Sequence, residues 1–525
     1  MRKLEEVLQD WEAVIGLEVH AELTTLKTKM FCGCKLEFGA DPNTHTCPVC
    51  LGLPGALPVP NKAAIESICL AGLATNCEIE KRSMFYRKNY MYPDMAKNFQ
   101  TTQGPVAFCM RGHLDLNVDG PAAKERYEYA SMKPGDTGEN ITCTEEGYIA
   151  HIGIERIHME EDAGKMVHVG GGEGRIAGAT HSLVDYNRAG TPLIELVTLP
   201  ALRTPEEARL FMQKLRQIYL AIGISDCSME EGSLRCDGNV SLRRRGEAKF
   251  GTKTELKNMN SFKNLHDGLA YEICRQAEVL EEGGVIYQET RHWDPSAKRT
   301  IVMRVKETAD DYRLFPEPDL APYDLSDEFI ESVRAKLPEL PDQKAARFSE
   351  SFGLSAYDAR TLVEHRYSAN FFEECMKETK DQAKLAKPLA NLITNDIAAY
   401  LNANSGVELS DTPLSPKRAV ELVSLIASDT ISSKQGKTVF AAIMEEDKDP
   451  SVIVEEKGMK QVSDTGAIEA VVDAIIAANP AEVARYKEGN TKVIGFFVGQ
   501  CMKEMRGQGN PKLINQILAK KLNEA

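Results

Sequence analysis

The stretch VIGLEVHAEL (residues 14–23) decides the fold of the N-terminal part of the chain. Within residues 16–22, Glu18, His20 and Glu22 are separated by single apolar residues. A period of two places alternate side chains on opposite faces of an extended strand. The stretch therefore predicts a β-strand with one polar face that carries two carboxylates and an imidazole.

Two later stretches, LRCDGNVSL (residues 234–242) and TKTELKN (residues 252–258), show the same period of two. Each predicts another strand with a polar face. The alternating polar residues of these stretches are Arg235, Asp237, Asn239, Ser241, Lys253, Glu255 and Lys257.

Two helices are predicted in the same part of the chain. The sequence TPEE (residues 204–207) matches a capping box with proline in the first turn, and apolar residues at helical spacing follow until Gly223. A second helix is expected from about residue 264 to 282, where Gly283 and Gly284 end it. Strands mixed with a few long helices indicate an α+β fold and not a regular βαβ array.

The composition changes near residue 310. Pro316, Pro318 and Pro322 make a stiff connector, and a mainly helical pattern follows. A second break, LSDTPLSP (residues 409–416), precedes a section that is predicted to be wholly helical. We therefore expect three domains, at residues 1–300, 301–410 and 411–525, in line with the length of 525 residues.

The overall composition excludes several classes of protein. Hydrophobic residues make up 42% and charged residues 27% of the chain, which excludes a disordered chain, a collagen-like fibre and a small disulfide scaffold. No apolar run reaches the roughly 18 residues that a membrane helix needs. The N-terminus lacks the pattern of a secretion signal. We expect a cytoplasmic protein that does not bind a membrane.

The net charge of −15, from 63 basic and 78 acidic residues, means that a polyanion could bind only through a local basic patch. Residues 485–525 carry eight basic and three acidic side chains, a local net charge of +5. This segment is a candidate nucleic-acid contact. A solvated helix end is the alternative reading of the same charges.

Four cysteines are grouped as two close pairs near the N-terminus. They are Cys32, Cys34, Cys47 and Cys50, and their spacing predicts a closed tetrahedral zinc site with a structural role. His45 is an alternative ligand, although it lies awkwardly close to Cys47 in the sequence. The remaining cysteines are scattered along the chain, which is typical of core packing.

Carboxylates recur on the predicted strands and in HMEEDAGK (residues 158–165), where Glu160, Glu161 and Asp162 are adjacent. Like charges gathered in one pocket need a divalent cation or protonation, and hard oxygen ligands favour Mg²⁺. The alternative is that these acids are separate surface residues.

Two familiar patterns can be excluded. ISSKQGKT (residues 431–438) lacks the first glycine of a nucleotide-binding P-loop, and GEGRIA (residues 172–177) lies between two predicted strands, which favours a hairpin over a dinucleotide loop. The sequence has no GxSxG elbow, so it offers no nucleophile that would release ammonia from glutamine.

Taken together, long blocks of this sequence resemble the GatB family, the B subunits of bacterial aspartyl/glutamyl-tRNA(Asn/Gln) amidotransferases. The resemblance covers essentially the whole chain. Besides the stretches quoted above, the matching blocks are LPGALPVPNKAA, RKNYMYPD, DYNRAGTPLIE, MEEGSLRCDGNVSLR, GTKTELKNMNSF, DDYRLFPEPDL and VGQCMKEMRGQGNP. The archaeal relative GatE carries a large extra domain that this chain lacks.

The resemblance implies an ATP-dependent reaction on misacylated tRNA. The family phosphorylates the side-chain carboxylate of Glu-tRNA(Gln) or Asp-tRNA(Asn), and ammonia then displaces the phosphate to give Gln-tRNA(Gln) or Asn-tRNA(Asn). An amidase (A) subunit supplies ammonia through an internal channel, and a small (C) subunit completes the complex. The implied fold is a cradle related to the glutamine synthetase and guanidino kinase catalytic fold, then a helical segment and an all-α tail of the YqeY type that touches the tRNA.

The resemblance also assigns roles to residues. Glu18, His20, Glu161 and Glu255 match the family positions around Mg²⁺ and the transamidation site, and Lys88 matches a lysine near the ammonia route and the phosphorylation pocket. Glu160 and Asp162 lie beside them and are candidates for cofactor binding. We interpret Arg235 as a clamp for phosphate, because a planar guanidinium pairs with two oxygens at once. Asp237 would orient Arg235 or hold a second metal ion.

Two alternatives remain at this point. One is a non-catalytic, zinc-containing RNA-binding scaffold whose acids are surface charges. The other is a free-standing kinase of small carboxylates, which would turn over without tRNA and is disfavoured by the basic helical tail.

Overall fold

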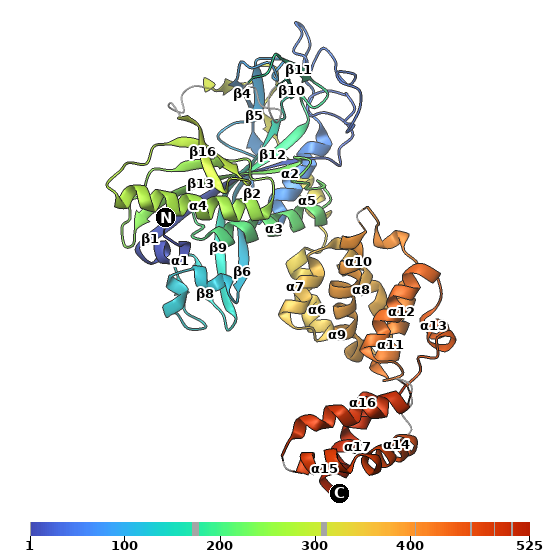
Figure 1. Cartoon of the computed structure of the whole chain (residues 1–525). Helices are drawn as coiled ribbons and strands as arrows, with labels where there is room; N and C mark the ends of the chain where they lie inside the picture. Colours follow the sequence, from blue (N-terminus) through green and yellow to red (C-terminus); the bar gives the residue numbers. More distant parts are fainter. Residues whose placement is uncertain are drawn as a thin grey trace. The chain divides into compact units, whose positions relative to one another are not determined.

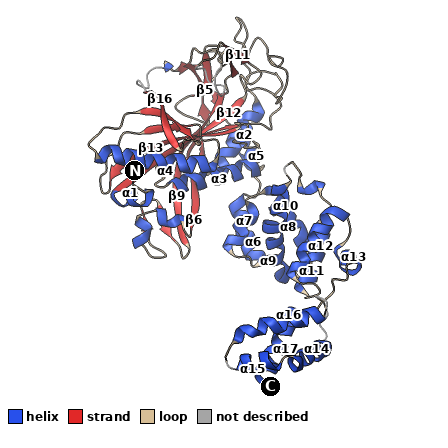
Figure 2. Cartoon of the chain, viewed as in Figure 1, coloured by secondary structure: helices blue, strands red, loops and turns tan. Residues whose placement is uncertain are grey.

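The computed structural model describes residues 2–170, 178–305, 312–404, 406–461, 465–487, 489–505 and 508–524. The chain divides into two compact units, Met1–Leu340 and Pro341–Ala525. Figure 2 shows that strands and helices are mixed in the first unit, whereas the second consists of helices joined by loops in its described residues. The predicted limits of the three domains stay a prediction.

One mixed sheet dominates the first unit (Figure 1). It has 14 strands among the described residues, and its neighbours are antiparallel except for the parallel pair β14 and β15. The main path runs β16 (Arg299–Val305), β15 (Glu289–Asp294), β14 (Thr254–Lys257), β13 (Leu234–Arg244), β1 (Trp11–Glu22), β12 (Pro192–Thr198), β9 (Gly147–Glu161), β5 (Phe99–Gln103), β4 (Phe85–Asn89) and β17 (Phe315–Pro316).

Four further strands lie off this path and join the sheet through β9. The largest of them, β6 (Cys109–Asp119), pairs with β9 over most of its length. The others are β2 (Glu78–Ile79), β7 (Thr137–Gly138) and β8 (Ile141–Cys143). A separate pair joins β3 (Arg82–Ser83) to β18 (Tyr323–Asp324).

Helices cover the apolar face of the sheet. The helices of this unit are α1 (Leu4–Asp10), α2 (Lys62–Ala74), α3 (Pro205–Ala221), α4 (Phe262–Glu281) and α5 (Asp327–Arg334). Figure 1 shows α3 and α4 side by side across the strands. Leu17 and Val19 of β1 belong to the same buried core as Leu215 of α3 and Leu269 of α4. The opposite face of β1 is therefore left for the polar residues that alternate with them.

The predicted strands and helices of this unit are confirmed. The alternating stretches form β1, β13 and β14, and the capping box begins α3, where the Thr204 hydroxyl accepts a hydrogen bond of 3.0 Å from the Glu207 amide. The second predicted helix is α4. The two predicted flanking strands form an antiparallel pair, β10 (Lys165–Val169) and β11 (His181–Asp185). The excluded dinucleotide loop, residues 172–177, lies outside the described residues.

The proline-rich connector is part of the sheet. Its residues Phe315 and Pro316 pair with β4 as an edge strand, where the missing N–H of proline costs no ladder hydrogen bond. Leu320 and Leu325 are buried in the core of this unit. The connector therefore closes one end of the sheet instead of spanning solvent.

The regular secondary structure described in the second unit is helical, and its buried hydrophobic residues form two separate cores. The first core, between Ala345 and Val454, is built by α6 (Pro341–Phe352), α7 (Ala356–Val363), α8 (Arg366–Glu378), α9 (Gln382–Asn391), α10 (Ala398–Ala403), α11 (Pro416–Ala427), α12 (Ser433–Glu446) and α13 (Pro450–Glu456). The second, between Ile468 and Leu522, is built by α14 (Thr465–Ala478), α15 (Pro480–Lys487), α16 (Ile494–Glu504) and α17 (Pro511–Glu524).

Candidate functional site

Five neighbouring strands, β14, β13, β1, β12 and β9, present polar side chains on one face of the sheet. Register places Glu18 opposite Asp237, and His20 lies between Arg235 on one side and Glu195 on the other. Side chains two residues apart on a strand point to the same face, and so do those of directly opposite residues on neighbouring strands. All of these side chains therefore lie on one face of the sheet. We call this surface the polar face.

The first group of acids on the polar face consists of Glu18, Asp237 and Glu255. One oxygen from each lies within 4.8 Å of the others. The Lys257 ammonium forms an ion pair with Asp237 and lies 3.6 Å from a Glu255 oxygen, and the Asn239 amide donates a 3.0 Å hydrogen bond to Glu18. We call these three carboxylates the acidic cluster.

A second group lies beside it and combines two histidines with two glutamates. His20 Nε2 is 3.4 Å from a Glu195 oxygen and 4.0 Å from a Glu160 oxygen. His158 Nε2 is 3.2 Å and 3.4 Å from the same two residues. His158 Nδ1 is buried and lacks a hydrogen-bond partner in the described part of the chain. This His/Glu cluster therefore has capacity to bind a further group.

The charges of the His/Glu cluster depend on one another. Burial lowers the pKa of His158, but hydrogen bonds to Glu160 and Glu195 outweigh burial and raise this pKa to about 9. Burial also opposes the charged form of His20, yet Glu195 and Glu160 hold its pKa above the ordinary value. Two imidazoles thus compensate two buried carboxylates.

A third group involves the predicted phosphate clamp. The Arg235 guanidinium bonds Asp162 and lies 3.2 Å from a Glu22 oxygen. Burial and the adjacent Asp162 carboxyl raise the pKa of Glu22 to about 8. Arg235 is therefore held by two protein carboxyl groups, and an incoming phosphate would have to compete with them for its guanidinium.

Glu161 lies apart from these groups, although it follows Glu160 directly. Its carboxylate forms an ion pair with Lys97 and accepts a 2.8 Å hydrogen bond from the Thr101 amide. Both partners belong to the segment that includes β5, which pairs with β9 on the side away from β12 and β1. Neighbouring residues of a strand face opposite ways, which accounts for the separation.

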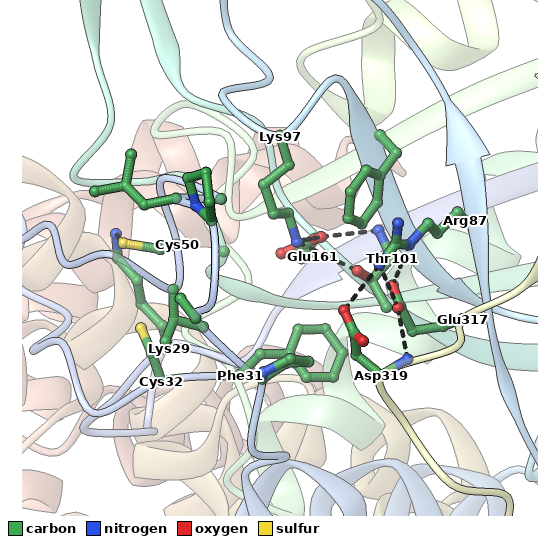
Figure 3. Close-up of a pocket in the computed structure, with 18 of the residues that line it drawn as sticks. Lys29, Phe31, Cys32, Cys50, Arg87, Lys97, Thr101, Glu161, Glu317 and Asp319 are labelled. Atoms are coloured by element: carbon green, nitrogen blue, oxygen red, sulfur yellow. Dashed lines mark hydrogen bonds and ion pairs between the residues drawn. The ribbon is translucent and has the colours of Figure 1, made fainter.

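Glu161 and Lys97 line a cavity of about 230 Å³ (Figure 3). On one side of it the Arg87 guanidinium donates hydrogen bonds of 2.8 Å and 2.7 Å to both oxygens of Glu317, from the connector. Lys88, the next residue, does not line this cavity, and its ammonium lies 5.0 Å from the centre of the Tyr312 ring. Side chains alternate between the two faces of β4, so Arg87 lines the cavity and Lys88 does not.

The four predicted zinc ligands come together on the other side of the cavity. Their sulfur atoms all lie within 4.8 Å of one another, and His45 is not part of the group. A tetrahedral ion with bonds of about 2.3 Å would place its sulfur ligands about 3.8 Å apart, so the residues fit a closed zinc site. Hydrogen bonding between the two sulfurs lowers the pKa of Cys50 to about 4 and raises the pKa of Cys32, so it favours the thiolate at Cys50 alone.

The predicted Mg²⁺ ligands thus divide among three places. Glu18 and Glu255 belong to the acidic cluster, together with Asp237; His20 belongs to the His/Glu cluster; and Glu161 lines the cavity. Asp237, predicted to orient Arg235 or to hold a second metal ion, lies in the acidic cluster and forms its ion pair with Lys257.

The sequence analysis did not predict several residues of these groups as site residues. Glu195 had a visible signal, since it is a lone acid in the apolar run PLIELVT of β12. His158 and Lys257 had weak signals. Lys97, Arg87 and Glu317 had none that spacing could supply, because they reach the cavity from distant segments.

The polar face has the chemistry to bind divalent cations beside a reactive carboxyl or phosphate group. Carboxylate oxygens are ligands that Mg²⁺ prefers, and three of them within a few ångströms repel one another unless a cation is present. The His/Glu cluster adds a neutral or charged imidazole at the next position along the sheet. Together they suit charge neutralisation in phosphoryl transfer.

Two family models match the chain. One is described as the GatB/GatE catalytic domain and matches residues 13–331, which include the polar face and the cavity. The other is described as a GatB domain and matches residues 370–522. The first model alone spans more than half of the chain.

The chain is also similar to curated proteins that are named as the B subunit of aspartyl/glutamyl-tRNA(Asn/Gln) amidotransferase. It is 50% identical to that of Carboxydothermus hydrogenoformans, over 98% of this chain and 99% of the relative. Identity is 47% to that of Brevibacillus brevis, over 98% and 100%, and 48% to that of Persephonella marina, over 97% and 99%. With both family models matched and the relatives covered end to end, the chain belongs to the GatB family of tRNA-dependent amidotransferases.

Proposed function

We propose that this chain converts Glu-tRNA(Gln), Asp-tRNA(Asn) or both into the corresponding Gln-tRNA(Gln) and Asn-tRNA(Asn). The observation that carries the proposal is the pairing of the acidic cluster with the His/Glu cluster on adjacent strands of one face. The names of its relatives support the same reaction. In this reaction ATP phosphorylates the side-chain carboxylate, and ammonia displaces the phosphate.

The carboxylate substrate explains why such a site is needed. Ammonia does not displace an oxide from a carboxylate, so the oxygen must first become part of a phosphate leaving group. Phosphoryl transfer is catalysed mainly by positioning and by neutralising charge. Two cations of the described chain lie on the polar face: Lys257, which contacts Asp237 and Glu255, and Arg235. In this proposal both help to neutralise charge.

Magnesium is the cation that we propose for the polar face. Glu18, Asp237 and Glu255 would hold one ion, and His20, Glu160 and Glu195 offer a second set of ligands. Mg²⁺ bound there would neutralise phosphate oxygens of ATP. The imidazole of His20 must be neutral to act as a ligand, so binding of the ion competes with its proton.

Ammonia would arrive from the other side of β9. The cavity that contains Glu161 lies on that side, and its glutamates are paired within the protein, Glu161 with Lys97 and Glu317 with Arg87. A cavity whose carboxylates are already paired does not retain a cation such as ammonium. In this proposal Glu161 belongs to the ammonia side, and Glu160 and Asp162 to the phosphate side.

The finer assignments follow the resemblance. We propose an amidase (A) subunit and a small (C) subunit as partners, ATP with Mg²⁺ as cofactors, zinc in the cysteine site, and the cytoplasm as the location. The segment from α15 to α17, with its excess of basic residues, would contact the tRNA body. We also propose that the sheet unit is related to the glutamine synthetase and guanidino kinase catalytic fold. Among the described residues, no helix is both long and apolar enough to cross a membrane.

The test uses the full chain co-purified with its two partner subunits. The complex is incubated with ATP, Mg²⁺, glutamine and Glu-tRNA(Gln) or Asp-tRNA(Asn), and the amino acid on the tRNA is identified. We expect Gln- or Asn-tRNA, and the same mixture with free glutamate should give no turnover. Turnover of the free amino acid at an equal rate would favour a kinase of small carboxylates.

A pair of variants tests the residues. Glu255→Gln removes one charge from the acidic cluster and should abolish amide formation while tRNA binding and glutaminase activity persist. Glu155→Gln, an exposed position on β9, is the matched control and should keep wild-type activity. Amide formation at the wild-type rate by Glu255→Gln would contradict the proposed role of the cluster.

A further inference from the structure

Lys29 is a fully buried lysine, with 0% of its surface exposed. Its ammonium donates a hydrogen bond of 3.0 Å to the Tyr186 carbonyl and lies 3.6 Å from the Cys50 sulfur. Within the described ranges, no carboxylate lies at ion-pair distance from this nitrogen. Lysine is among the residues that proteins bury least, and a buried ammonium needs a compensating negative charge.

Nearby groups offer few sources of that charge. The Tyr186 carbonyl is a neutral dipole and satisfies one of the three ammonium protons. Glu161 lines the same cavity as Lys29, but its carboxylate is already bonded by Lys97 and the Thr101 amide. The remaining candidate is the sulfur of Cys50.

Four thiolates around a divalent ion supply that negative charge. Each cysteine ligand binds as a thiolate, so a four-cysteine centre with one divalent ion retains two negative charges in excess. Groups next to such ligands that donate hydrogen bonds or carry positive charge stabilise the bound metal, and their loss weakens it. Lys29 contacts the cluster at Cys50, whose sulfur belongs to the four-cysteine group.

We propose that Lys29 is the charge partner of the four-cysteine metal centre. It is a positioning residue, because it contacts a ligand and not the metal ion. Lys29, Cys32 and Cys50 all line the cavity that contains Glu161 (Figure 3). The metal centre and its charge partner therefore form part of the cavity wall. This inference rests on the geometry of Lys29 and does not depend on the reaction proposed above.

The first test measures metal affinity. Full-length protein is stripped of metal and titrated with Zn²⁺ in competition with a chromophoric chelator. Lys29→Met, which fills a similar volume without charge, should weaken Zn²⁺ binding by about 10- to 100-fold. Lys29→Arg should restore part of the loss. Lys35→Met is the matched control: Lys35 follows Cys34, is exposed and pairs with Glu37, so its loss should leave the affinity unchanged.

The second test uses the size of a stability change with and without zinc. In zinc-loaded protein, Lys29→Met should lower the midpoint of thermal unfolding, because the centre loses its partner. Once a chelator has removed the ion, the charged centre that Lys29 accompanies is gone, so the same substitution should lower the midpoint by less. An equal decrease in both states, or wild-type zinc affinity in Lys29→Met, would overturn the proposal.

A second variant covers the case in which Lys29→Met does not fold. Lys29→Gln keeps a donor for the Tyr186 carbonyl and removes the charge. It should show the same loss of zinc affinity, and wild-type affinity in this variant would overturn the proposal equally.

Discussion

His20 and Glu195 lie directly opposite each other on β1 and β12, with Nε2 and Oε2 3.4 Å apart. The sequence pattern indicated His20 as a residue of the candidate site, but it did not indicate Glu195. Because Glu195 also contacts His158, its charge supports both imidazoles of the His/Glu cluster.

Replacing Glu195 by glutamine should therefore weaken the proposed Mg²⁺ site at the His/Glu cluster. The Mg²⁺ concentration for half-maximal amide formation should rise by about 10- to 100-fold. The same variant should lower the pKa of His158 from about 9 toward 6.5, which histidine NMR titration would record. An unchanged Mg²⁺ requirement, with Glu155→Gln as control, would remove Glu195 from the site.

His266 gives a pH dependence that is separate from the polar face. Hydrogen bonding to Glu125 and Asp267 outweighs burial and raises its pKa from 6.5 to about 9. The folded state thus holds this proton more tightly than the unfolded state. The stabilisation is complete below pH 6.5 and is lost as the pH rises through about 9.

Urea unfolding of wild type and His266→Asn at several pH values checks this dependence. The difference in free energy of unfolding between the two should shrink between pH 6.5 and 9. A difference that stays constant over this window would show that Glu125 and Asp267 do not hold the proton. Replacement of the exposed His181 by Asn should keep the wild-type slope.

Glu207 combines two tasks at the start of α3. Its backbone completes the cap with Thr204, and its buried carboxylate is 3.0 Å from Arg126 and 2.8 Å from the Tyr148 hydroxyl. Glu207→Gln leaves the buried Arg126 with less compensating charge and should cost about 3 kcal/mol or more in free energy of unfolding. Tyr148→Phe, which removes one hydrogen bond, should cost about 1 kcal/mol by the same urea measurement. Equal costs would mean that the charge contributes little.

Gly52 tests the contact between the cysteine loop and the cavity. It has φ of +66°, and a Cβ there would lie 2.6 Å from Lys97 Cγ. Gly55, at φ +84°, has nothing within 4 Å of such a Cβ. Both alanine variants should lose about 1 kcal/mol to backbone strain, and Gly52→Ala should lose more because Lys97 must move from Glu161.

The control for Gly52 is a second substitution at Lys97. In a Lys97→Ala background, the extra cost of Gly52→Ala over Gly55→Ala in free energy of unfolding should fall, because the 2.6 Å contact with Cγ is gone and only the 3.2 Å contacts with Cα and Cβ remain. An undiminished extra cost would show that the glycine is required for another reason.

The local structure of the first unit could be predicted because its signals are short-range. The period of two around His20 and the cap at Thr204 depend on residues within one strand or one turn. The path of the connector could not be predicted in the same way, because the pairing of Phe315 with β4 is an interaction between segments that are distant in the sequence.

The candidate site was predicted in part for the same reason. Spacing indicated Glu18, Asp237 and Glu255 as residues of polar strand faces, but their proximity depends on the order of β14, β13 and β1 in the sheet. The acids of residues 158–162 were treated as one group. They lie at the end of β9, and neighbouring residues of a strand point to opposite faces of the sheet. Glu160 and Glu161 therefore have different surroundings.

This alternation along β9 constrains how the strand can change length. An insertion or deletion of one residue just before His158 would exchange the side chains that meet His20 with those that meet Lys97, and both groups would lose their partners together. A change of two residues would restore the alternation. Viable length variants of this strand should therefore differ by even numbers, or carry a compensating bulge that absorbs the odd residue.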